Sequence, residues 1–415
     1  MANVILTHDM LAERALFDLK NELTFTNHVF KGYKDEFHAV GGFKKGNSVR
    51  VQLPNRFRAK DGATMDPVEL EERNTTVTVD KQKHVALQIT GSQMTFNIEK
   101  FSEKVIKPAI SALANQVDYD GLSEYVNVYN QVGTPGTTPS TYAALASGAE
   151  RLDNESVSRE DRVAVLSPKA HWGLASGELK SVFNEAIVET MVRKGFLGRF
   201  AIMDFFMDQN VRSHTVGVRT NDTCAVKTTS SEGDTTIALK GLAAGDIIAA
   251  GDIITIESVA GVNPVSGQIW EGAELRQFVC TTAGTADASG EIAALAISPK
   301  IYSSSANEDF LPIQTVNDLP AANDTVTIVS GSSGVSYPQN LLFHPNAFAF
   351  TCVPIAAPMS AGKSVAWGQA TDEDLGLSIT VSTDWDSTNF RENTRIDILY
   401  GWDTIEANYA VRLVG

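Results

Sequence analysis

The stretch most suggestive of chemistry is Ala357 to Ser364, a relaxed phosphate-loop pattern that follows an apolar segment, Phe348 to Ile355. Such a loop works because accessible backbone N–H groups point at the phosphates and a helix begins at its Lys-Ser or Lys-Thr pair. Here Ala357 stands in place of the first glycine, Pro358 removes one amide, and the residues after Ser364 are poor helix formers. The pattern argues against a nucleotide site.

The other reactive residue types do not cluster along the chain. The seven histidines show neither His-x-x-x-His spacing nor the Cys/His grouping that binds zinc. No Gly-x-Ser-x-Gly motif is present to hold a nucleophilic serine, and acidic groups such as Asp372 to Asp374 are common in solvated loops. We therefore predict no catalytic residue, no metal ligand and no cofactor, and the protein is not expected to be an enzyme.

Length and composition set broad limits. A chain of 415 residues allows two or three domains with a sizeable core. With 34 basic and 50 acidic residues, the net charge of -16 does not attract nucleic acid in bulk. Cys224, Cys280 and Cys352 match no disulfide or zinc spacing and are expected to be reduced thiols. The sequence shows no signal peptide and no apolar run of about 18 residues, so we expect a soluble, cytosolic product without a membrane partner.

The longest regular pattern runs from Asn97 to Tyr129, where apolar residues recur every three or four positions. This spacing predicts one long amphipathic helix, with Asn97 as its N-cap and Glu99 near the positive end of the helix dipole. Such a helix would span on the order of 45 Å. Pro108 lies inside the pattern and removes one backbone hydrogen bond, so we expect a kink or a break there.

Two extended features precede this helix. Thr7 to Leu23 has the pattern of a short amphipathic helix, either part of its own domain's core or an arm on a neighbouring subunit. Alternating residues at 49–53, 77–79 and 85–89 predict the strands of a long hairpin-like ribbon.

The tip of this ribbon separates its charges. The basic residues of the first limb are Lys44, Lys45, Arg50, Arg56, Arg58 and Lys60, and the acidic residues of the second are Asp66, Glu69, Glu71 and Glu72. A solvated loop explains this pattern, and so does a ribbon that lies on a complementary neighbour. Because isolated two-stranded ribbons are marginal in water, a partner surface is physically reasonable.

The rest of the chain divides by composition and periodicity. Helices are predicted at 142–152, 168–175 and 184–194, and strands at 162–166 and 199–206, which together indicate a mixed α/β domain. A Thr-, Ser- and Gly-rich region follows, with short strands at 253–256, 277–280, 292–297 and 325–329. Apolar runs at 341–355, 377–383 and 396–413 then restore the α/β character, so the β-rich region is predicted to be an insertion.

Several stretches carry a family resemblance: 101–109 with 113–115, 214–217, 262–268, 275–279 and 340–348. Together with the arm, ribbon and long helix, they resemble the major capsid proteins of tailed bacteriophages, whose shared architecture is the Johnson (Hong Kong 97-like) fold. The likeness is greatest to coat proteins of short-tailed phages that carry an inserted β-barrel.

The resemblance implies an α+β fold with five parts. They are an N-terminal arm (1–45), an extended β-ribbon loop (46–90), a peripheral domain with the spine helix (91–138), an axial α/β domain (139–220 and 341–415) and an inserted all-β, barrel-like domain (221–340).

The resemblance also implies a function. A non-enzymatic coat protein of this kind assembles with itself into pentamers and hexamers of an icosahedral head that encloses double-stranded DNA without sequence-specific binding. Scaffolding protein, portal protein and a decoration protein are the implied partners, with assembly in the host cytoplasm and the virion as the destination. The candidate inter-subunit residues are Arg50, Arg56, Arg58, Lys60, Asp66, Glu69, Glu71 and Glu72, and Pro108 is the candidate hinge for procapsid maturation.

Three alternatives remain open at this stage. An encapsulin-like compartment shell would share the fold but not the insertion or the length. A P-loop NTPase would need the loop at 357–364 to bind phosphate, and a β-rich surface or carbohydrate-binding protein is suggested only by the Thr- and Gly-rich insertion.

Overall fold

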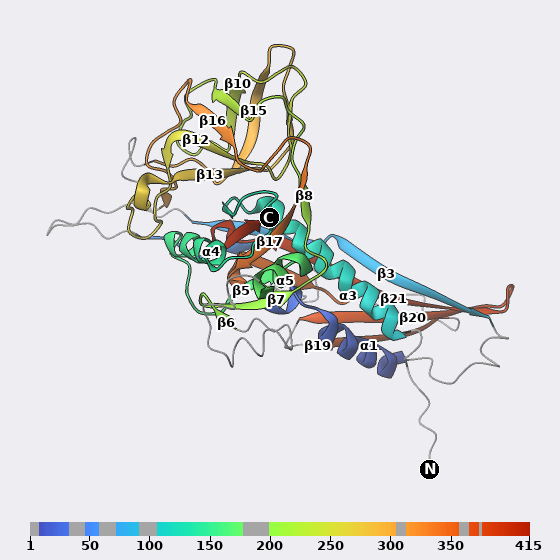
Figure 1. The fold of residues 1–415 in the computed structure, drawn as a ribbon. Coiled ribbons are helices and arrows are strands. Elements are labelled where there is room, and N and C mark those ends of the chain that lie inside the picture. Colours follow the sequence, from blue (N-terminus) through green and yellow to red (C-terminus); the bar gives the residue numbers. More distant parts are fainter. Residues whose placement is uncertain are drawn as a thin grey trace. The chain divides into compact units, whose positions relative to one another are not determined.

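A computed structural model gives the arrangement of most of the chain (Figure 1). The residues it describes are 8–32, 46–57, 72–90, 106–176, 199–303, 313–356, 365–372 and 376–415. The chain divides into two compact units: unit 1 comprises Met1–Val51, Asn74–Leu122 and Phe348–Ile405, and unit 2 comprises Gln52–Arg73, Ser123–Ala347 and Glu406–Gly415.

The centre of unit 1 is a five-stranded antiparallel sheet. Its strands are β18 (Phe348–Cys352), β21 (Arg391–Thr404), β20 (Leu377–Asp386), β19 (Val365–Asp372) and β3 (Lys81–Thr90). The long strand β21 carries β3 along one edge, and β20 and β18 follow one another along the other. In β21 the buried side chains of Ile396, Ile398 and Tyr400 recur at every second position, as expected for a strand with one face in the core.

The ribbon differs from its prediction. Strands β1 (Ser48–Gln52) and β2 (Asn74–Thr78) do pair as a two-stranded sheet, with Val49, Val51 and Val77 buried on one side. The predicted strand at 85–89, however, lies in β3, which pairs along its full length with β21 of the same chain. That limb therefore gains its backbone hydrogen bonds inside its own subunit, because an edge of the central sheet is available to it.

The helices of unit 1 confirm most of the sequence pattern. The predicted arm helix is α1 (His8–Glu22), and the spine is α3 (Lys107–Leu122). The α-helix ends at Leu122 instead of Tyr129, and the chain continues as the 3-10 helix η4 (Ser123–Asn127). Pro108 lies in the first turn of α3, where a missing N–H is tolerated. Residues 97–105 lie outside the described residues, so the kink at Pro108 stays a prediction.

A buried carboxylate fastens the arm to the spine. Asp118 of α3 accepts hydrogen bonds from the backbone N–H groups of Thr24 (2.7 Å), Phe25 (3.3 Å) and Thr26 (3.0 Å), and from the Thr26 hydroxyl. Burial raises the pKa of Asp118, although these hydrogen bonds act to lower it. Next to them, the Asn27 amide caps the end of α1 by donating to the Leu23 carbonyl at 2.6 Å.

Unit 2 contains a seven-stranded mixed sheet covered by helices. Its strands are β4 (Gln131–Val132), β22 (Ala410–Val414), β17 (Ser336–Phe343), β5 (Arg162–Leu166), β7 (Met203–Met207), β6 (Arg199–Phe200) and β8 (Ser213–Thr215). Leucines of α4 (Tyr142–Asn154) and α5 (Pro168–Ser176) share a core with buried residues of β5, β7, β17 and β22. The helices predicted at 142–152 and 168–175 and the strand at 162–166 are confirmed.

One predicted strand of this sheet is wrong in form. Residues 199–206 were expected to be a single central strand, but Ala201 and Ile202 have positive φ values of 48° and 63° and separate β6 from β7. The two strands pair antiparallel, and β6 ends the sheet order. The helix predicted at 184–194 lies outside the described residues.

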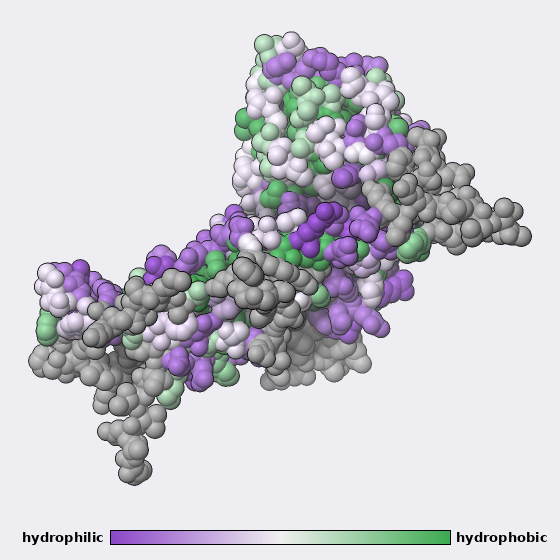
Figure 2. All heavy atoms as spheres, turned by 180° about the vertical axis from the view of Figure 1, so that it is seen from behind, coloured by the Kyte–Doolittle hydropathy of each residue, from purple (hydrophilic) through white to green (hydrophobic). Residues whose placement is uncertain are grey.

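The inserted region is a closed barrel, as predicted. Its strands are β9 (Thr223–Val226), β10 (Thr236–Lys240), β12 (Ile253–Ala260), β13 (Leu275–Cys280), β15 (Glu291–Ser298) and β16 (Thr325–Ile328), and a short pair, β11 (Ile247–Ile248) and β14 (Gly284–Thr285), lies beside them. Hydrophobic side chains from all six strands fill its interior. The surface of the molecule around this core mixes hydrophobic and hydrophilic residues (Figure 2).

The two chain connections of the barrel lie side by side. Strand β8 leads into the insertion and β17 leads out of it, and they pair antiparallel with His214 opposite Tyr337. Two adjacent connections let a whole module be inserted without disturbing the sheet that carries it.

The compact units do not follow the predicted boundary of the axial domain at 341–415. Residues 348–405 group with the spine helix in unit 1, and only Glu406–Gly415 returns to unit 2. The reason is that β18 to β21 form a sheet with β3, which was expected to belong to the ribbon. The segment 357–364, which has the phosphate-loop pattern, lies outside the described residues.

We predict that Asp118→Ala loosens the arm. The change leaves three backbone donors at residues 24–26 without their acceptor, which should lower the free energy of unfolding by about 2–4 kcal/mol. Urea unfolding and amide hydrogen exchange at those residues measure the effect. Asp118→Asn keeps one acceptor oxygen and should lose less unfolding free energy than Asp118→Ala. Unchanged amide protection in Asp118→Ala would show that the carboxylate does not hold the arm.

Candidate assembly surface and the joint of the inserted barrel

The charged residues predicted to make contacts between subunits are only partly described. Arg50 lies on the exposed side of β1, and Glu72 is exposed at the start of the segment that leads into β2. Five further candidates lie outside the described residues: Arg58, Lys60, Asp66, Glu69 and Glu71. Of the eight candidates, the structure therefore describes Arg50, Arg56 and Glu72.

Arg56 has a partner in its own chain. Its Nη2 lies 3.4 Å from Oε2 of Glu406, and Arg73 reaches the other carboxylate oxygen of Glu406 at 2.8 Å. The Leu53 N–H donates to the Arg73 carbonyl at 2.8 Å, so the segment after β1 and the segment before β2 lie side by side. Sequence analysis missed Arg73 and Glu406, because nothing local marks two residues that are more than 300 positions apart in the chain.

The ribbon is also held within unit 1. The Thr78 N–H donates to Oδ2 of Asp403 at 2.7 Å. Position 401 requires glycine, because a Cβ there would lie 1.9 Å from the Thr78 carbonyl oxygen. Burial raises the pKa of Asp403 to about 6, and the nearby charge of Asp80 adds to the effect. Strand β2 therefore lies directly against β21 at a position where no side chain separates the two backbones.

A buried contact that contains several charged side chains joins the barrel to the rest of unit 2. We call Tyr129, Arg151, Glu155, Trp270 and Arg276 the barrel joint. Arg276 of β13 is 2% exposed and its Nη1 lies 2.7 Å from Oε1 of Glu155, at the end of α4. The Arg276 guanidinium also lies 4.7 Å from the centre of the Tyr129 ring and 5.1 Å from that of Trp270. Its charge is thus balanced by one carboxylate and two π faces.

Other contacts of the joint extend this attachment. Arg151 of α4 lies over the Trp270 ring at 4.6 Å and pairs with Glu274 at 3.1 Å. Gln277 of β13 accepts from the Gln131 N–H at 2.6 Å and donates to the Gln131 carbonyl at 2.9 Å. This reciprocal pair continues the hydrogen bonding of β4 into the barrel, so the contact has a fixed register.

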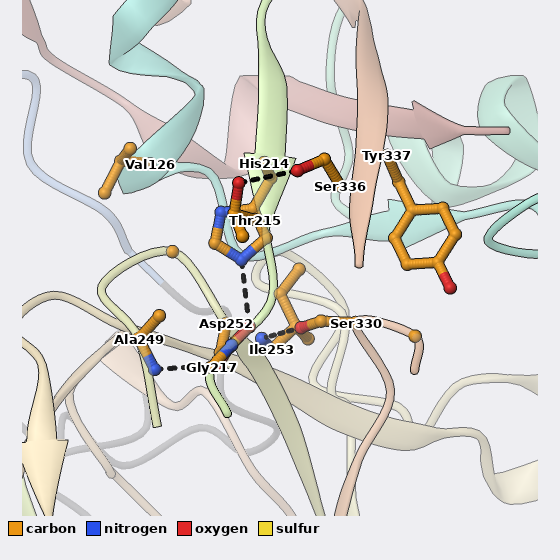
Figure 3. A network of polar contacts seen from close by, with 12 residues as sticks. Val126, His214, Thr215, Gly217, Ala249, Asp252, Ile253, Ser330, Ser336 and Tyr337 are labelled. Carbon is orange, nitrogen blue, oxygen red and sulfur yellow. Dashed lines mark hydrogen bonds and ion pairs between the residues drawn. The ribbon is translucent and has the colours of Figure 1, made fainter. Parts of the chain in front are cut away.

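A second buried network lies where the chain enters the barrel (Figure 3). Nε2 of His214 lies 2.9 Å from Oδ1 of Asp252, and Nδ1 of His214 lies 3.3 Å from the Tyr125 hydroxyl. The other oxygen of Asp252 accepts from the N–H groups of Gly217 (3.1 Å) and Ala249 (2.7 Å). Both ring nitrogens of His214 and both carboxylate oxygens of Asp252 therefore have hydrogen-bond partners.

Arg412 of β22 completes this network. It is fully buried, donates to the Gly251 carbonyl at 2.7 Å and to the Val126 carbonyl at 3.3 Å, and lies over the Tyr125 ring at 5.2 Å. Burial lowers the pKa of Arg412 to about 10, which still leaves it protonated at neutral pH. One cation therefore links the last strand, the end of η4 and the turn before β12.

The Tyr125–His214–Asp252 chain has the connectivity of a nucleophile, a base and an orienting acid. Its members are 7%, 3% and 0% exposed, so a substrate could not approach the tyrosine oxygen. Its geometry instead suits a fully satisfied buried network that fixes the position of the barrel. The network and the barrel joint bind parts of the chain to one another, and neither presents a reactive group to solvent.

Other sites are not indicated in the part of the chain that the structure describes. No group of three or more His, Cys, Asp or Glu residues there is placed to hold a metal ion. Cys224, Cys280 and Cys352 are buried free thiols, and burial raises the pKa of each. None of the described helices has both the length and the apolar character that crossing a membrane requires.

An arm helix, a charged ribbon, a spine helix and a barrel inserted into an α/β unit define a shell-forming structural protein. The family model described as "P22 coat protein - gene protein 5" matches residues 39–415. The chain belongs to the P22 coat protein family, and it is a major capsid protein of an icosahedral bacteriophage shell with the Johnson fold. The predicted fold class is confirmed, and the family does not favour the compartment, NTPase or carbohydrate-binding alternatives.

Comparison with solved structures finds capsids at low sequence identity. A chain from Mycobacterium phage Che8 is 12% identical with a TM-score of 0.47, covering 94% of this chain and 90% of that one. The mature capsid of bacteriophage PhiM1 gives 11% identity, a TM-score of 0.42 and coverage of 88% and 81%. A virus-like particle from Pyrococcus furiosus is 7% identical with a TM-score of 0.39, covering 97% of this chain and 96% of that one. No curated protein matches the chain.

We predict that breaking the buried pair of the barrel joint is costly. Arg276→Met leaves Glu155 buried without its partner and should lower the free energy of unfolding by about 3–5 kcal/mol. Glu155→Gln should have a similar effect. The double variant should lose less unfolding free energy than the two single variants lose in sum. A double-mutant cycle by urea unfolding measures this coupling. Strictly additive losses would contradict a direct interaction.

We predict that Asp403→Asn stabilises the protein at neutral pH. Because the folded-state pKa of Asp403 is raised to about 6 from 3.8, the folded state holds its proton more tightly, and this contribution to stability falls as pH rises from about 4 to 6. The amide keeps an acceptor for the Thr78 N–H and should add about 1 kcal/mol at pH 7, since partial exposure screens the charge. Unfolding midpoints across pH 4–7 test this, and an unaltered pH dependence would refute it.

Proposed function

We propose that this coat protein assembles into the pentamers and hexamers of a phage head that encloses double-stranded DNA. The observation that carries the proposal is the match of the coat protein family to residues 39–415, which spans the ribbon, the spine helix and the inserted barrel. A scaffolding protein guides the assembly, a portal protein occupies one vertex, and a decoration protein binds outside. Assembly takes place in the host cytoplasm.

The protein acts without catalysis in this proposal. Its buried polar networks are closed to solvent, and their work is to hold the barrel, arm and ribbon in place. DNA is enclosed without sequence-specific contacts, as the net charge of -16 favours. The buried free thiols fit a product that assembles in the reducing interior of the host.

The parts of the chain take distinct roles. Residues 1–45 form the arm, 46–90 the extended loop, 91–138 the peripheral domain, 139–220 with 341–415 the axial domain, and 221–340 the barrel. Because β18 to β21 share a sheet with β3, we move residues 348–405 from the axial domain to the peripheral domain, which leaves 139–220, 341–347 and 406–415 in the axial domain. Pro108 remains the proposed hinge for maturation.

Assembly of the purified protein tests the proposal. Subunits expressed with the scaffolding gene of the same genome should give closed shells by negative-stain microscopy and a fast-sedimenting peak, and shells loaded with DNA should form in infected cells. Protein that remains monomeric under both conditions would overturn the proposal.

We predict that the exposed charge of the ribbon acts between subunits. Arg50 lies on the open side of β1, so Arg50→Glu should reduce the yield of shells several-fold at low salt, because a reversed charge repels a complementary neighbour. Arg50→Gln should have a smaller effect, and added salt should narrow the difference. The unfolding midpoint should not change. Equal shell yield for all three proteins would remove Arg50 from the interface.

Arg56 is a matched comparison in the same ribbon. Because it already pairs with Glu406 in its own chain, Arg56→Glu should lower the stability of the subunit as well as assembly. Comparing the Arg50 and Arg56 variants therefore distinguishes a charge that stabilises the folded subunit from a charge that acts only in assembly.

A further inference from the structure

The turn between β20 and β21 presents two aromatic rings to solvent. Trp385 is 41% exposed and Phe390 is 66% exposed, and their rings meet edge to face with centres 5.1 Å apart. The strands on either side are in register, with Trp385 opposite Glu392 and Asp386 opposite Arg391. We call residues 385–390 the aromatic tip; it lies at the end of the β20–β21 hairpin, at the right of Figure 1.

The aromatic tip has a fixed shape. The Asp386 carboxylate accepts hydrogen bonds from the Asn389 side chain (2.7 Å) and backbone (3.2 Å), from Nε of Arg391 (3.0 Å) and from the Thr388 N–H (3.0 Å). These hydrogen bonds, those from Asn389 first, lower the pKa of Asp386 to about 2, so the carboxylate stays ionised. A turn held in this way loses little conformational entropy when a partner binds it.

Phe390 is an unfavourable residue for the backbone that it occupies. Its φ is 49°, in the left-handed region where Gly and Asn are preferred and a bulky side chain is an outlier. Its ring is mostly exposed, so burial within the subunit does not repay this strain. Strain at an exposed residue points to a role outside the folded subunit.

We propose that the aromatic tip is a contact surface for a second copy of this chain in the shell. This inference rests on the proposed function, which surrounds every subunit with identical neighbours. Aromatic side chains on a rigid support are the residues that most often dominate binding energy at interfaces. Glu392 lies opposite Trp385 in the strand register, so the matching surface of the second copy is apolar with a basic rim.

The test removes the rings while keeping the turn. Phe390→Asn suits the left-handed backbone, and Trp385→Ser removes its partner, so the double variant should unfold at the same urea concentration as the wild type. The subunit concentration needed for half-maximal assembly should rise about tenfold or more. Ser387→Ala, in the same turn, should assemble like the wild type, and Trp385→Phe should retain most of the assembly.

Fluorescence gives a second readout. The difference in emission between the wild type and Trp385→Phe isolates Trp385 among the five tryptophans. Acrylamide should quench this difference strongly in free subunits and several-fold less in shells. Normal assembly of the double variant, or Trp385 equally open to acrylamide in shells and subunits, would overturn the inference.

Two further outcomes are distinguishable. A defect that appears only with scaffolding protein, while association of subunits alone is unchanged, would overturn the second copy as the partner and assign the tip to the scaffold. Failure of the wild type to assemble at all would instead overturn the proposed function.

Discussion

The buried pair of Arg276 and Glu155 is the interaction on which the attachment of the inserted barrel depends. A guanidinium taken out of water is stable only if its charge is balanced, and here one carboxylate and the rings of Tyr129 and Trp270 do so together. Because each partner comes from a different element, the barrel can occupy only one position relative to the sheet of unit 2. The reciprocal hydrogen bonds of Gln131 and Gln277 then fix the register of that contact.

Extended segments elsewhere are held by the same kind of interaction. Asp118 binds the turn after the arm helix, Asp403 binds the ribbon strand β2, and Glu406 binds the two arginines at the base of the ribbon. In each case a carboxylate from another part of the chain accepts hydrogen bonds from the segment or pairs with its arginines. Buried or half-buried acceptors of this type hold these segments within the subunit before it meets its neighbours.

Local periodicity accounts for what could be predicted. Residues 253–256 and 162–166 are short, wholly buried and largely apolar runs of the kind that predicts a core strand, and the apolar spacing of residues 8–22 predicts the arm helix. The pairing of β3 with β21 could not be seen in this way, because strand periodicity shows which face is buried and not which strand is the neighbour. Glu406 and Asp252 were missed for the same reason, since an isolated acidic residue gives no sign of a distant partner.

The adjacency of β8 and β17 has an evolutionary consequence. Because the insertion leaves and rejoins the sheet at neighbouring residues, His214 and Tyr337, recombination could exchange the barrel for another module without changing the framework around it. The barrel joint limits such exchange, since a replacement module without an equivalent of Arg276 would leave Glu155 buried without a cationic partner. Any module inserted at this point would need a guanidinium of its own placed to pair with Glu155.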